Sequence, residues 1–223
     1  MILVVIFMKA VGIICEYNPF HNGHLYHLTK VKELFPNDTI VLVLSPTFSQ
    51  RGVPSIINKW EKTTLALEYG IDLIVELPYP FACQSADFFA KGSIQILKEL
   101  KVSNLVFGSE CNNIETLTKI AKVQIENKEC DNLVQDYLQQ GINYPTALSR
   151  AIKKLTNECV LNPNDLLGVS YIKEIIKQKS NIIPHCIKRT NDYHSNDAKD
   201  GIKSANTNLT TATKILPIIE HNK

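Results

Sequence analysis

The chain has 223 residues, of which 44% are hydrophobic, and a formal net charge of +2 at pH 7. This length and hydrophobic content permit a full globular core, and the near balance of charge permits a nucleic-acid partner without indicating one. The six cysteines form no C-x-x-C pair and no compact framework. They exclude a disulfide-stapled scaffold and favour a reducing, cytoplasmic location.

Residues 1–7 are apolar, but no positively charged region precedes them and no small-residue cleavage site follows. They fit neither a secretory signal nor a membrane span, so we expect no membrane partner.

Continuous apolar runs alternate with helical periodicities along most of the chain. The runs predict strands at 10–15, 39–44, 72–77, 104–107 and 181–188. Strands of this composition, separated by helices, are typical of a parallel sheet buried on both faces. We therefore predict an α/β fold, a doubly wound Rossmann-like parallel sheet of about five strands. An added helical block, 114–155, carries no motif, and the chain has neither a P-loop nor a dinucleotide fingerprint.

Local signals refine these elements. Ser85 is expected to cap a helix that runs to Leu100 and turns Phe89, Ile96 and Leu100 toward the core. A rigid turn is expected at 78–80 because of its two prolines. The helix from Pro163 to about Lys177 is expected to use Asn164 or Asp165 as its cap, and Pro184 places the last strand at a sheet edge.

The most informative stretch is 13–28, a strand that breaks at Asn18-Pro19 and restarts as a helix. A strand that leads directly into a helix exposes free backbone N–H groups and the positive end of the helix dipole, which suit a phosphate. His21 and His24 lie three residues apart on one side of that helix. Gly23 between them leaves room for a nucleobase to approach the backbone. The stretch therefore predicts a phosphate or nucleotide site.

Two other interpretations of these histidines remain open. His21, His24 and His27 can share a helix face and bind a metal, although no nearby cysteine pair or carboxylate completes a ligand shell. They can also be ordinary, partly buried histidines of an amphipathic helix. We assign no metal ligand.

The run His-Asn-Gly-His resembles the HxGH signature of the nucleotidylyltransferase superfamily, in which it contacts ATP phosphates. The longer string from Glu16 to His27, EYNPFHNGHLYH, is similar to the tRNA(Met) cytidine acetate ligase family of bacteria. Further segments match that family: 50–54 with Lys59-Trp60, then 84–90, the Gly108 region, Pro163 to Gly168, and Arg189. Arg51 and Lys59 can hold anionic oxygens; alternatively, Lys59 and Trp60 simply begin a helix.

This resemblance implies an ATP site, with Mg²⁺, in which His21 and His24 are catalytic and stabilise charge on the α- and β-phosphates. The residues that it implies for ATP binding are Ile14, Cys15, Glu16, Tyr17, Asn18, Pro19, Phe20, His21, Asn22, Gly23, His24, Leu25, Tyr26, His27, Gly108, Asn164 and Arg189.

The implied reaction activates acetate as acetyl-adenylate and acetylates N4 of the wobble cytidine of elongator tRNA(Met). ATP, acetate and tRNA(Met) are the implied partners, and no protein partner is evident. The alternatives are an adenylyltransferase that acts on a small phosphorylated metabolite, and a nucleotide-binding remnant without tRNA acetylation activity.

The resemblance covers 8–200, which we expect to be the nucleotidyltransferase-like ATP-binding domain, with 1–7 as an N-terminal extension. In 201–223 the chain diverges: Ser204 and Ala205 fit a Ser/Thr-rich superfamily motif, but Leu209 stands where an arginine is expected. We expect this tail to be the remnant of a missing C-terminal region. No basic stripe is evident, so poor tRNA acetylation is expected of this chain.

Overall fold

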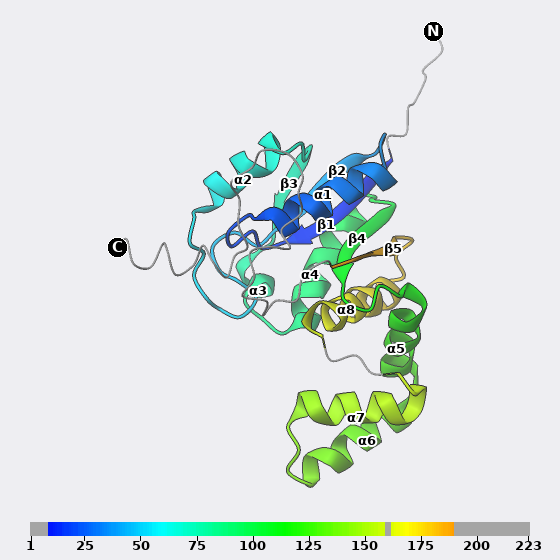
Figure 1. Ribbon diagram of the computed structural model, residues 1–223. Coiled ribbons are helices and arrows are strands. Elements are labelled where there is room, and N and C mark those ends of the chain that lie inside the picture. The colour runs from blue at the N-terminus through cyan, green and yellow to red at the C-terminus, as the bar shows by residue number, and fades with distance from the viewer. Residues whose placement is uncertain (1–8, 159–161, 190–223) are drawn as a thin grey trace, which may run out of the picture.

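We describe residues 9–158 and 162–189 of a computed structural model (Figure 1). Within them, five parallel strands form one sheet in the order β3-β2-β1-β4-β5. The strands are β1 (Ala10–Cys15), β2 (Thr39–Leu44), β3 (Leu73–Glu76), β4 (Asn104–Ser109) and β5 (Ile183–Lys188). From β1 the chain builds outward to β3 on one side and then to β5 on the other. The predicted doubly wound sheet is confirmed, and its switch point lies between β1 and β4.

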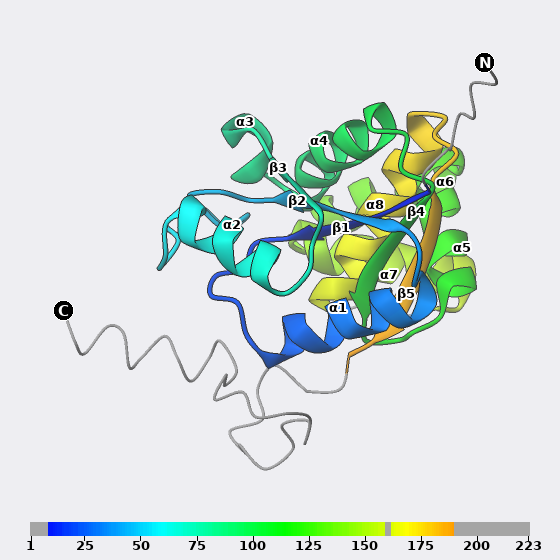
Figure 2. The same cartoon turned by 90° about the horizontal axis from the view of Figure 1, so that it is seen from above.

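Helices cover both faces of this sheet, as Figures 1 and 2 show. The helices are α1 (Asn22–Leu34), α2 (Lys59–Glu68), α3 (Tyr79–Ala82), α4 (Ala86–Glu99), α5 (Ile114–Glu126), α6 (Lys128–Gln139), α7 (Tyr144–Thr156) and α8 (Pro163–Lys177). Alternate residues of β2 face opposite layers: Leu42 and Leu44 pack in the cluster of α1 and α2, whereas Val41 and Val43 pack in the cluster of α4, α5 and α8. This two-sided burial explains the continuous apolar runs.

The added helical block has a small core of its own. Cys130 and Val134 of α6 pack with Ala147 and Ala151 of α7, and Figure 1 shows this pair projecting below the sheet next to α5. Asn127 and Asn143 cap the two helices through their side chains. The predicted helices of this block are confirmed.

Several local predictions were wrong. The region expected to be a rigid turn at 78–80 begins α3, because proline fits the first turn of a helix, where its missing N–H is not needed. Leu100 is 41% exposed because α4 has already ended at Glu99; Ile94 and Leu97 take the buried positions instead. Ser85 is the N-cap residue of α4, but its side chain makes no capping hydrogen bond with the described residues.

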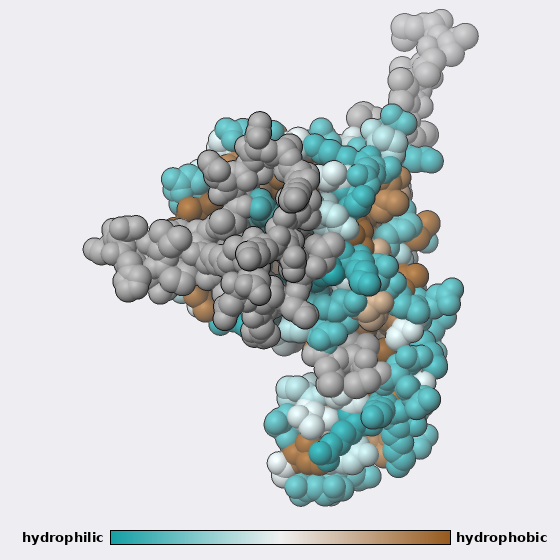
Figure 3. All heavy atoms as spheres, in the orientation of Figure 1, coloured by the Kyte–Doolittle hydropathy of each residue, from teal (hydrophilic) through white to brown (hydrophobic). Residues whose placement is uncertain are grey.

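The visible surface is mostly polar, with single apolar residues scattered over it (Figure 3). None of the helices in 9–158 and 162–189 combines the length and the hydropathy needed to span a bilayer.

Candidate functional site

The two signature histidines cap α1 through each other. His21 is the N-cap residue, and its Nδ1 accepts a hydrogen bond from the Gly23 N–H at 3.0 Å. His24 Nδ1 accepts the N–H of His21 at 3.3 Å, which completes a capping box usually built from Ser or Thr with Glu or Gln. The prediction that these N–H groups are free for a phosphate was therefore wrong for His21 and Gly23, whose N–H groups bind imidazoles.

This capping determines which ring nitrogen carries the proton. Because Nδ1 accepts in both rings, each neutral imidazole carries its hydrogen on Nε2. Burial, with a smaller contribution from the Arg189 charge, lowers the pKa of His21 to about 4. Burial, reinforced by the charges of His21, His27 and Arg189, holds the pKa of His24 well below its usual value. The rings stack with centroids 3.8 Å apart, so two neutral Nε2–H donors lie side by side.

Gly23 is required by this arrangement rather than by a ligand alone. A Cβ atom added there would lie 2.9 Å from Cε1 of the His21 ring. The missing side chain leaves space for the imidazole that caps the helix. The sequence interpretation assigned this space to a nucleobase, and the structure shows that His21 occupies the part nearest the backbone.

An aromatic cluster supports His24 from behind. The chain reverses at Tyr17, which has a positive φ of 46°, and at the cis peptide Asn18–Pro19. Tyr17 and Phe20 are buried, with Tyr17 packed edge-on against both Phe20 and His24. Phe20 stacks on Tyr69 at 4.7 Å. These side chains, expected at the ATP site, form the scaffold that holds the imidazole.

Other residues of the signature are occupied in the same way. Leu25 and Tyr26 pack against the core beneath α1, together with Cys15, whereas Ile14 packs on the opposite face of the sheet. Asn22, Pro19 and Gly23 lie at the turn into the helix itself. The structure therefore places most of this stretch in the support of the site and brings His21 and His24 to its rim.

Glu16 and Asn18 hold the loop between β2 and α2. The Glu16 carboxylate accepts the N–H of Gln50 at 2.6 Å, and Asn18 Oδ1 accepts the N–H of Ile56 at 2.8 Å. The loop that follows β2 lies on the same edge of the sheet as the histidines. Its backbone is fixed by the two side chains.

Lys62 is a functional candidate that sequence reasoning missed. It is fully buried, and its ammonium donates to the carbonyl oxygens of Glu16 at 2.8 Å and Ser45 at 3.1 Å and to Ser55 Oγ at 2.6 Å. Burial lowers the pKa of Lys62 to about 8, against the opposing charge of Glu16. The spacing of Lys62 and Ala66, four residues apart and therefore on one face of a helix, was the signal in the sequence that Lys62 lies on the buried face of α2.

Three predicted residues that are far apart in sequence meet on the other side of β1. Arg189 continues β5, where its N–H binds the Ser109 carbonyl oxygen at 2.9 Å. One guanidinium nitrogen of Arg189 donates to Asn164 Oδ1 at 3.4 Å. A Cβ atom on Gly108 would lie 3.3 Å from Cγ of Arg189, so this glycine makes room for the arginine stem. The Arg189 charge contributes to the lowered pKa values of His21, His24 and His27.

Glu110 and Asp165, also missed, lock this side together. Glu110 accepts hydrogen bonds from Asn164 Nδ2 at 2.5 Å and from the Asp165 N–H at 3.0 Å. Asp165 in return accepts from Ser109 Oγ at 2.5 Å and from the Glu110 N–H at 3.0 Å. The prediction that Asn164 or Asp165 caps α8 was wrong: the N-cap residue is Asn162, and the carboxylate of Glu110 satisfies the first turn.

His27 contributes an unused polar atom. Its Nε2 is buried and has no hydrogen-bond partner among the described residues, while its ring contacts the backbone of Val106. Burial and the Arg189 charge lower the pKa of His27 to about 4. No group of three or more His, Cys, Asp or Glu residues in 9–158 and 162–189 is arranged to hold a metal ion.

Other candidates lie further along the same edge of the sheet, toward β3, or outside the described residues. Arg51 is exposed in the β2–α2 loop, and Lys59 forms an ion pair with Glu76 at 2.8 Å. Ser204, Ala205 and Leu209 fall outside the described part of the chain.

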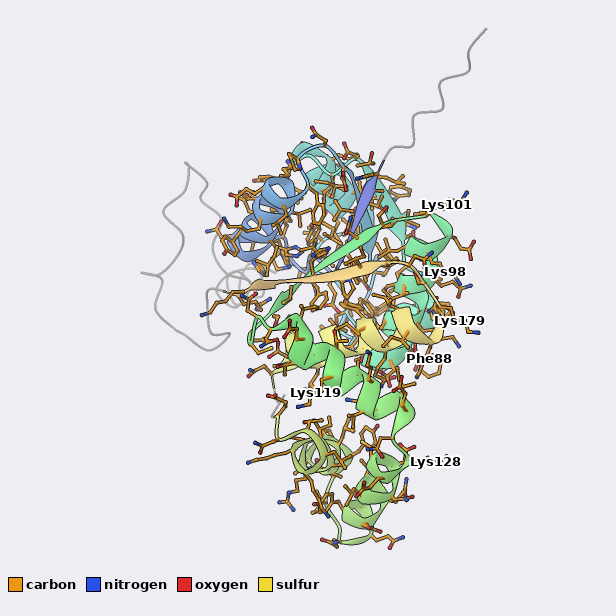
Figure 4. All side chains as sticks on the ribbon, turned by 90° about the vertical axis from the view of Figure 1, so that its right-hand side faces the viewer. Phe88, Lys98, Lys101, Lys119, Lys128 and Lys179 are labelled. Carbon is orange, nitrogen blue, oxygen red and sulfur yellow. The ribbon has the colours of Figure 1, made fainter. Side chains whose placement is uncertain are left out.

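Several exposed lysines gather on one side of the molecule in Figure 4. Lys101 and Lys179 immediately precede β4 and β5. They therefore lie at the amino edge of the sheet, opposite the site.

This geometry defines an α/β protein with a doubly wound sheet, whose switch point is where such proteins bind ligands and here carries two neutral histidine donors, an arginine and a buried lysine. The model of the HIGH nucleotidyl transferase family matches residues 8–214. The chain belongs to that family.

Relatives and solved structures support this assignment. The chain is 45% identical over 212 residues to the tRNA(Met) cytidine acetate ligase of Anoxybacillus flavithermus. The aligned region covers 93% of this chain and 52% of the relative. The ligase of Mesomycoplasma hyopneumoniae is 38% identical, with 96% and 66% covered. Thermotoga maritima TmcAL bound with alpha-thio ATP matches with a TM-score of 0.82 and 35% identity, covering 96% of this chain and 51% of that one. The chain thus spans about half the length of most of these relatives.

Proposed function

We propose that this chain binds ATP across the ends of β1 and β4, with the phosphates facing His21 and His24. The observation that carries the proposal is the pair of neutral imidazoles whose Nδ1 atoms are occupied, which leaves both Nε2–H groups as donors. Each Nε2–H can donate to an anionic oxygen while Nδ1 of the same ring keeps its backbone N–H. The similarity to a structure bound with alpha-thio ATP supports the ligand.

Arg189, Asn164 and Gly108 form the opposite wall in this proposal. Arg189 supplies a permanent positive charge, which the phosphates require once water is excluded. Its guanidinium is held by Asn164, and its stem lies over Gly108. We place the remaining residues of 14–27, including the buried His27, in the support of the site.

We further propose that the chain contributes this site to an ATP-dependent acetate ligase that acts on tRNA(Met), as the names of its relatives suggest. An acetate oxygen would attack the α-phosphorus, forming acetyl-adenylate as the bond to the β-phosphate oxygen breaks and pyrophosphate leaves. Negative charge grows on the bridging and α-phosphate oxygens during this step. His21, His24 and Arg189 are positioned to stabilise it, and Mg²⁺ would supply further neutralisation.

The second half-reaction transfers the acetyl group. The N4 amino group of the wobble cytidine would attack the acetyl carbonyl, forming the amide, releasing AMP and losing one N4 proton. Such a substrate implies a cytoplasmic location for the protein, and the five cysteines among the described residues are free thiols.

Acetate-dependent exchange of labelled pyrophosphate into ATP tests the first half-reaction. We expect exchange with acetate, and we expect it to fall in the His24→Ala variant. Exchange that instead requires a small phosphorylated metabolite would identify an adenylyltransferase. ATP binding without any exchange would identify a nucleotide-binding remnant.

A further inference from the structure

A small hollow opens beside the proposed ATP site, where α2 begins over the ends of β2 and β3. It has a volume of about 150 Å³. Its lining residues are Leu44, Pro46, Lys59, Trp60, Thr63, Ile74 and Glu76. Pockets for drug-sized ligands measure ~300–1,000 Å³, so a hollow of this size suits one planar base and is too small for a nucleoside triphosphate.

One wall of the hollow is an exposed tryptophan. Trp60 is 71% exposed, although an indole ring usually buries most of its surface. Its backbone N–H is fixed at the start of α2 by Asn58, which caps the helix. The ammonium of Lys59 lies 5.1 Å from the centroid of the indole ring. An exposed aromatic face beside a cation is the arrangement on which single-stranded nucleic acids stack their bases.

A donor and an acceptor lie next to this ring. The Lys59 ammonium and the Glu76 carboxylate bind each other at 2.8 Å, and 37% and 51% of their side-chain surfaces are exposed. An ion pair this exposed contributes little to stability, so a ligand that offers its own donor and acceptor can replace it at small cost. Cytosine offers both: an N4 amino group, which glutamate accepts, and the adjacent N3 and O2 acceptors, which suit an ammonium.

The hollow lies on the same edge of the sheet as the histidines. Strand register pairs Cys15 with Leu44 and Leu44 with Glu76. At about 4.8 Å per strand, Glu76 is roughly 10 Å from the end of β1, on the side away from Gly108. The Lys62 ammonium spans the intervening gap, because it binds the backbone of Glu16 and Ser45 at once. A base in the hollow would therefore approach the nucleotide from the β2 side.

We propose that this hollow binds the acceptor cytosine: Trp60 stacks on the base, Glu76 accepts a hydrogen from N4, and Lys59 donates to the ring. This inference rests on the proposed function, because it assigns the second substrate of that reaction. It makes Glu76 and Trp60 specificity-determining residues; Trp60 belongs to a segment that resembles the family.

Trp60 itself reports on the proposal, because it is the only tryptophan in the chain. Titrating the protein with a short oligocytidylate should quench its fluorescence to saturation. A matched oligouridylate, which lacks the amino group, should bind at least several-fold more weakly. In Glu76→Gln the affinity for oligocytidylate should fall roughly tenfold, as expected for the loss of a hydrogen bond to a charged group.

Two control variants separate this site from general surface effects. Glu33→Gln breaks another exposed lysine–glutamate pair, that of Lys30 on α1, and should leave quenching unchanged. Phe88→Ala removes another exposed aromatic ring with a lysine over it, on α4, and should leave oligocytidylate binding unchanged in a filter assay, whereas Trp60→Ala should weaken it. Figure 4 labels Phe88, which belongs to α4, whereas the hollow is lined by residues of β2, β3, α2 and the loop after β2.

Equal quenching by both oligonucleotides, or an unaltered affinity in Glu76→Gln, would overturn the assignment. Saturable quenching by ATP that is lost in Glu76→Gln would overturn it too, because the hollow would then hold adenine. Acetate-dependent pyrophosphate exchange by the wild-type protein tests the proposed function separately. If exchange is normal but oligocytidylate does not quench, only the base site is wrong; if exchange is absent, the proposed function itself fails.

Discussion

Replacing Lys62 by methionine keeps a side chain of similar length but removes the buried ammonium, which links three segments of the polypeptide. In the wild-type protein this group donates to the carbonyl oxygens of Glu16 and Ser45 and to the hydroxyl of Ser55. Without it these acceptors lose their donor, and each buried group left unpaired costs ~1–3 kcal/mol. The total for three such groups is roughly 6 kcal/mol.

The cost of burying the charge offsets part of this loss. Burial lowers the pKa of Lys62 from 10.5 to about 8, and at ~1.4 kcal/mol per pH unit this corresponds to about 3 kcal/mol. The variant no longer has that cost. The free energy of unfolding at pH 7 should therefore be lower in Lys62→Met by about 3 kcal/mol, because the lost hydrogen bonds outweigh the relieved charge.

The pH dependence carries the sharper test. Because the pKa of Lys62 is lower in the folded protein, the unfolded state binds more protons between pH 8 and 10.5. The free energy of unfolding contributed by this group therefore rises with pH across that window, by about 3 kcal/mol. The variant lacks this rise, so the difference between the two proteins should grow from about 3 to about 6 kcal/mol.

Urea unfolding at pH 7 and pH 10.5 measures this difference. Other groups titrate in the same range; burial raises the pKa of Cys15 to about 12, for example, which lowers stability above pH 9. Such contributions are shared by both proteins and cancel in the difference. A difference that stays constant or shrinks at pH 10.5 would show that Lys62 is not a buried charge.

Three further results are expected. His24→Ala should lower turnover by ~10²–10³ with little change in ATP affinity, because its donor acts on developing phosphate charge; an equal loss of affinity and turnover would contradict this. Glu110→Gln should weaken ATP binding, measured by calorimetry, roughly tenfold. The substitution replaces one of the two carboxylate oxygens, which accept from Asn164 and from the Asp165 N–H, by an NH₂ donor; an unchanged affinity would contradict this. Since His21 and His27 have folded pKa values of about 4, below the usual 6.5, stability should fall as pH drops from 6.5 toward 4. The fall in the urea unfolding midpoint between pH 6.5 and pH 4 should be smaller in His27→Phe than in the wild-type protein.

The strongest sequence signals were those in which burial and local structure agree. The strands 10–15 and 39–44 have the predicted bounds because both faces are buried, so no polar residue interrupts them. Pro184 marked an edge strand correctly, since an edge tolerates the missing N–H. Predictions failed at the ends of elements: the region 78–80 began a helix, and Leu100 lies beyond the end of α4.

The signature histidines illustrate a partial success. The spacing of His21 and His24 predicted a helix start with both rings on one side, and the structure has both. The spacing did not predict that each ring would accept a backbone N–H, because histidine is an unusual capping residue. That detail decides which nitrogen is the donor, and with it the chemistry proposed for the pair.

By itself the sequence determined the alternation of strands and helices and the motif at the end of β1, because both depend on contacts between near neighbours in the chain. Only the tertiary structure decided that Lys62 binds Glu16, 46 residues away, and that Glu110 binds Asp165, 55 residues away. Strand order and register bring these pairs together, and no local periodicity encodes either one. The charges that complete the site are therefore set by the sheet, which places the ends of β2, β1, β4 and β5 along one edge.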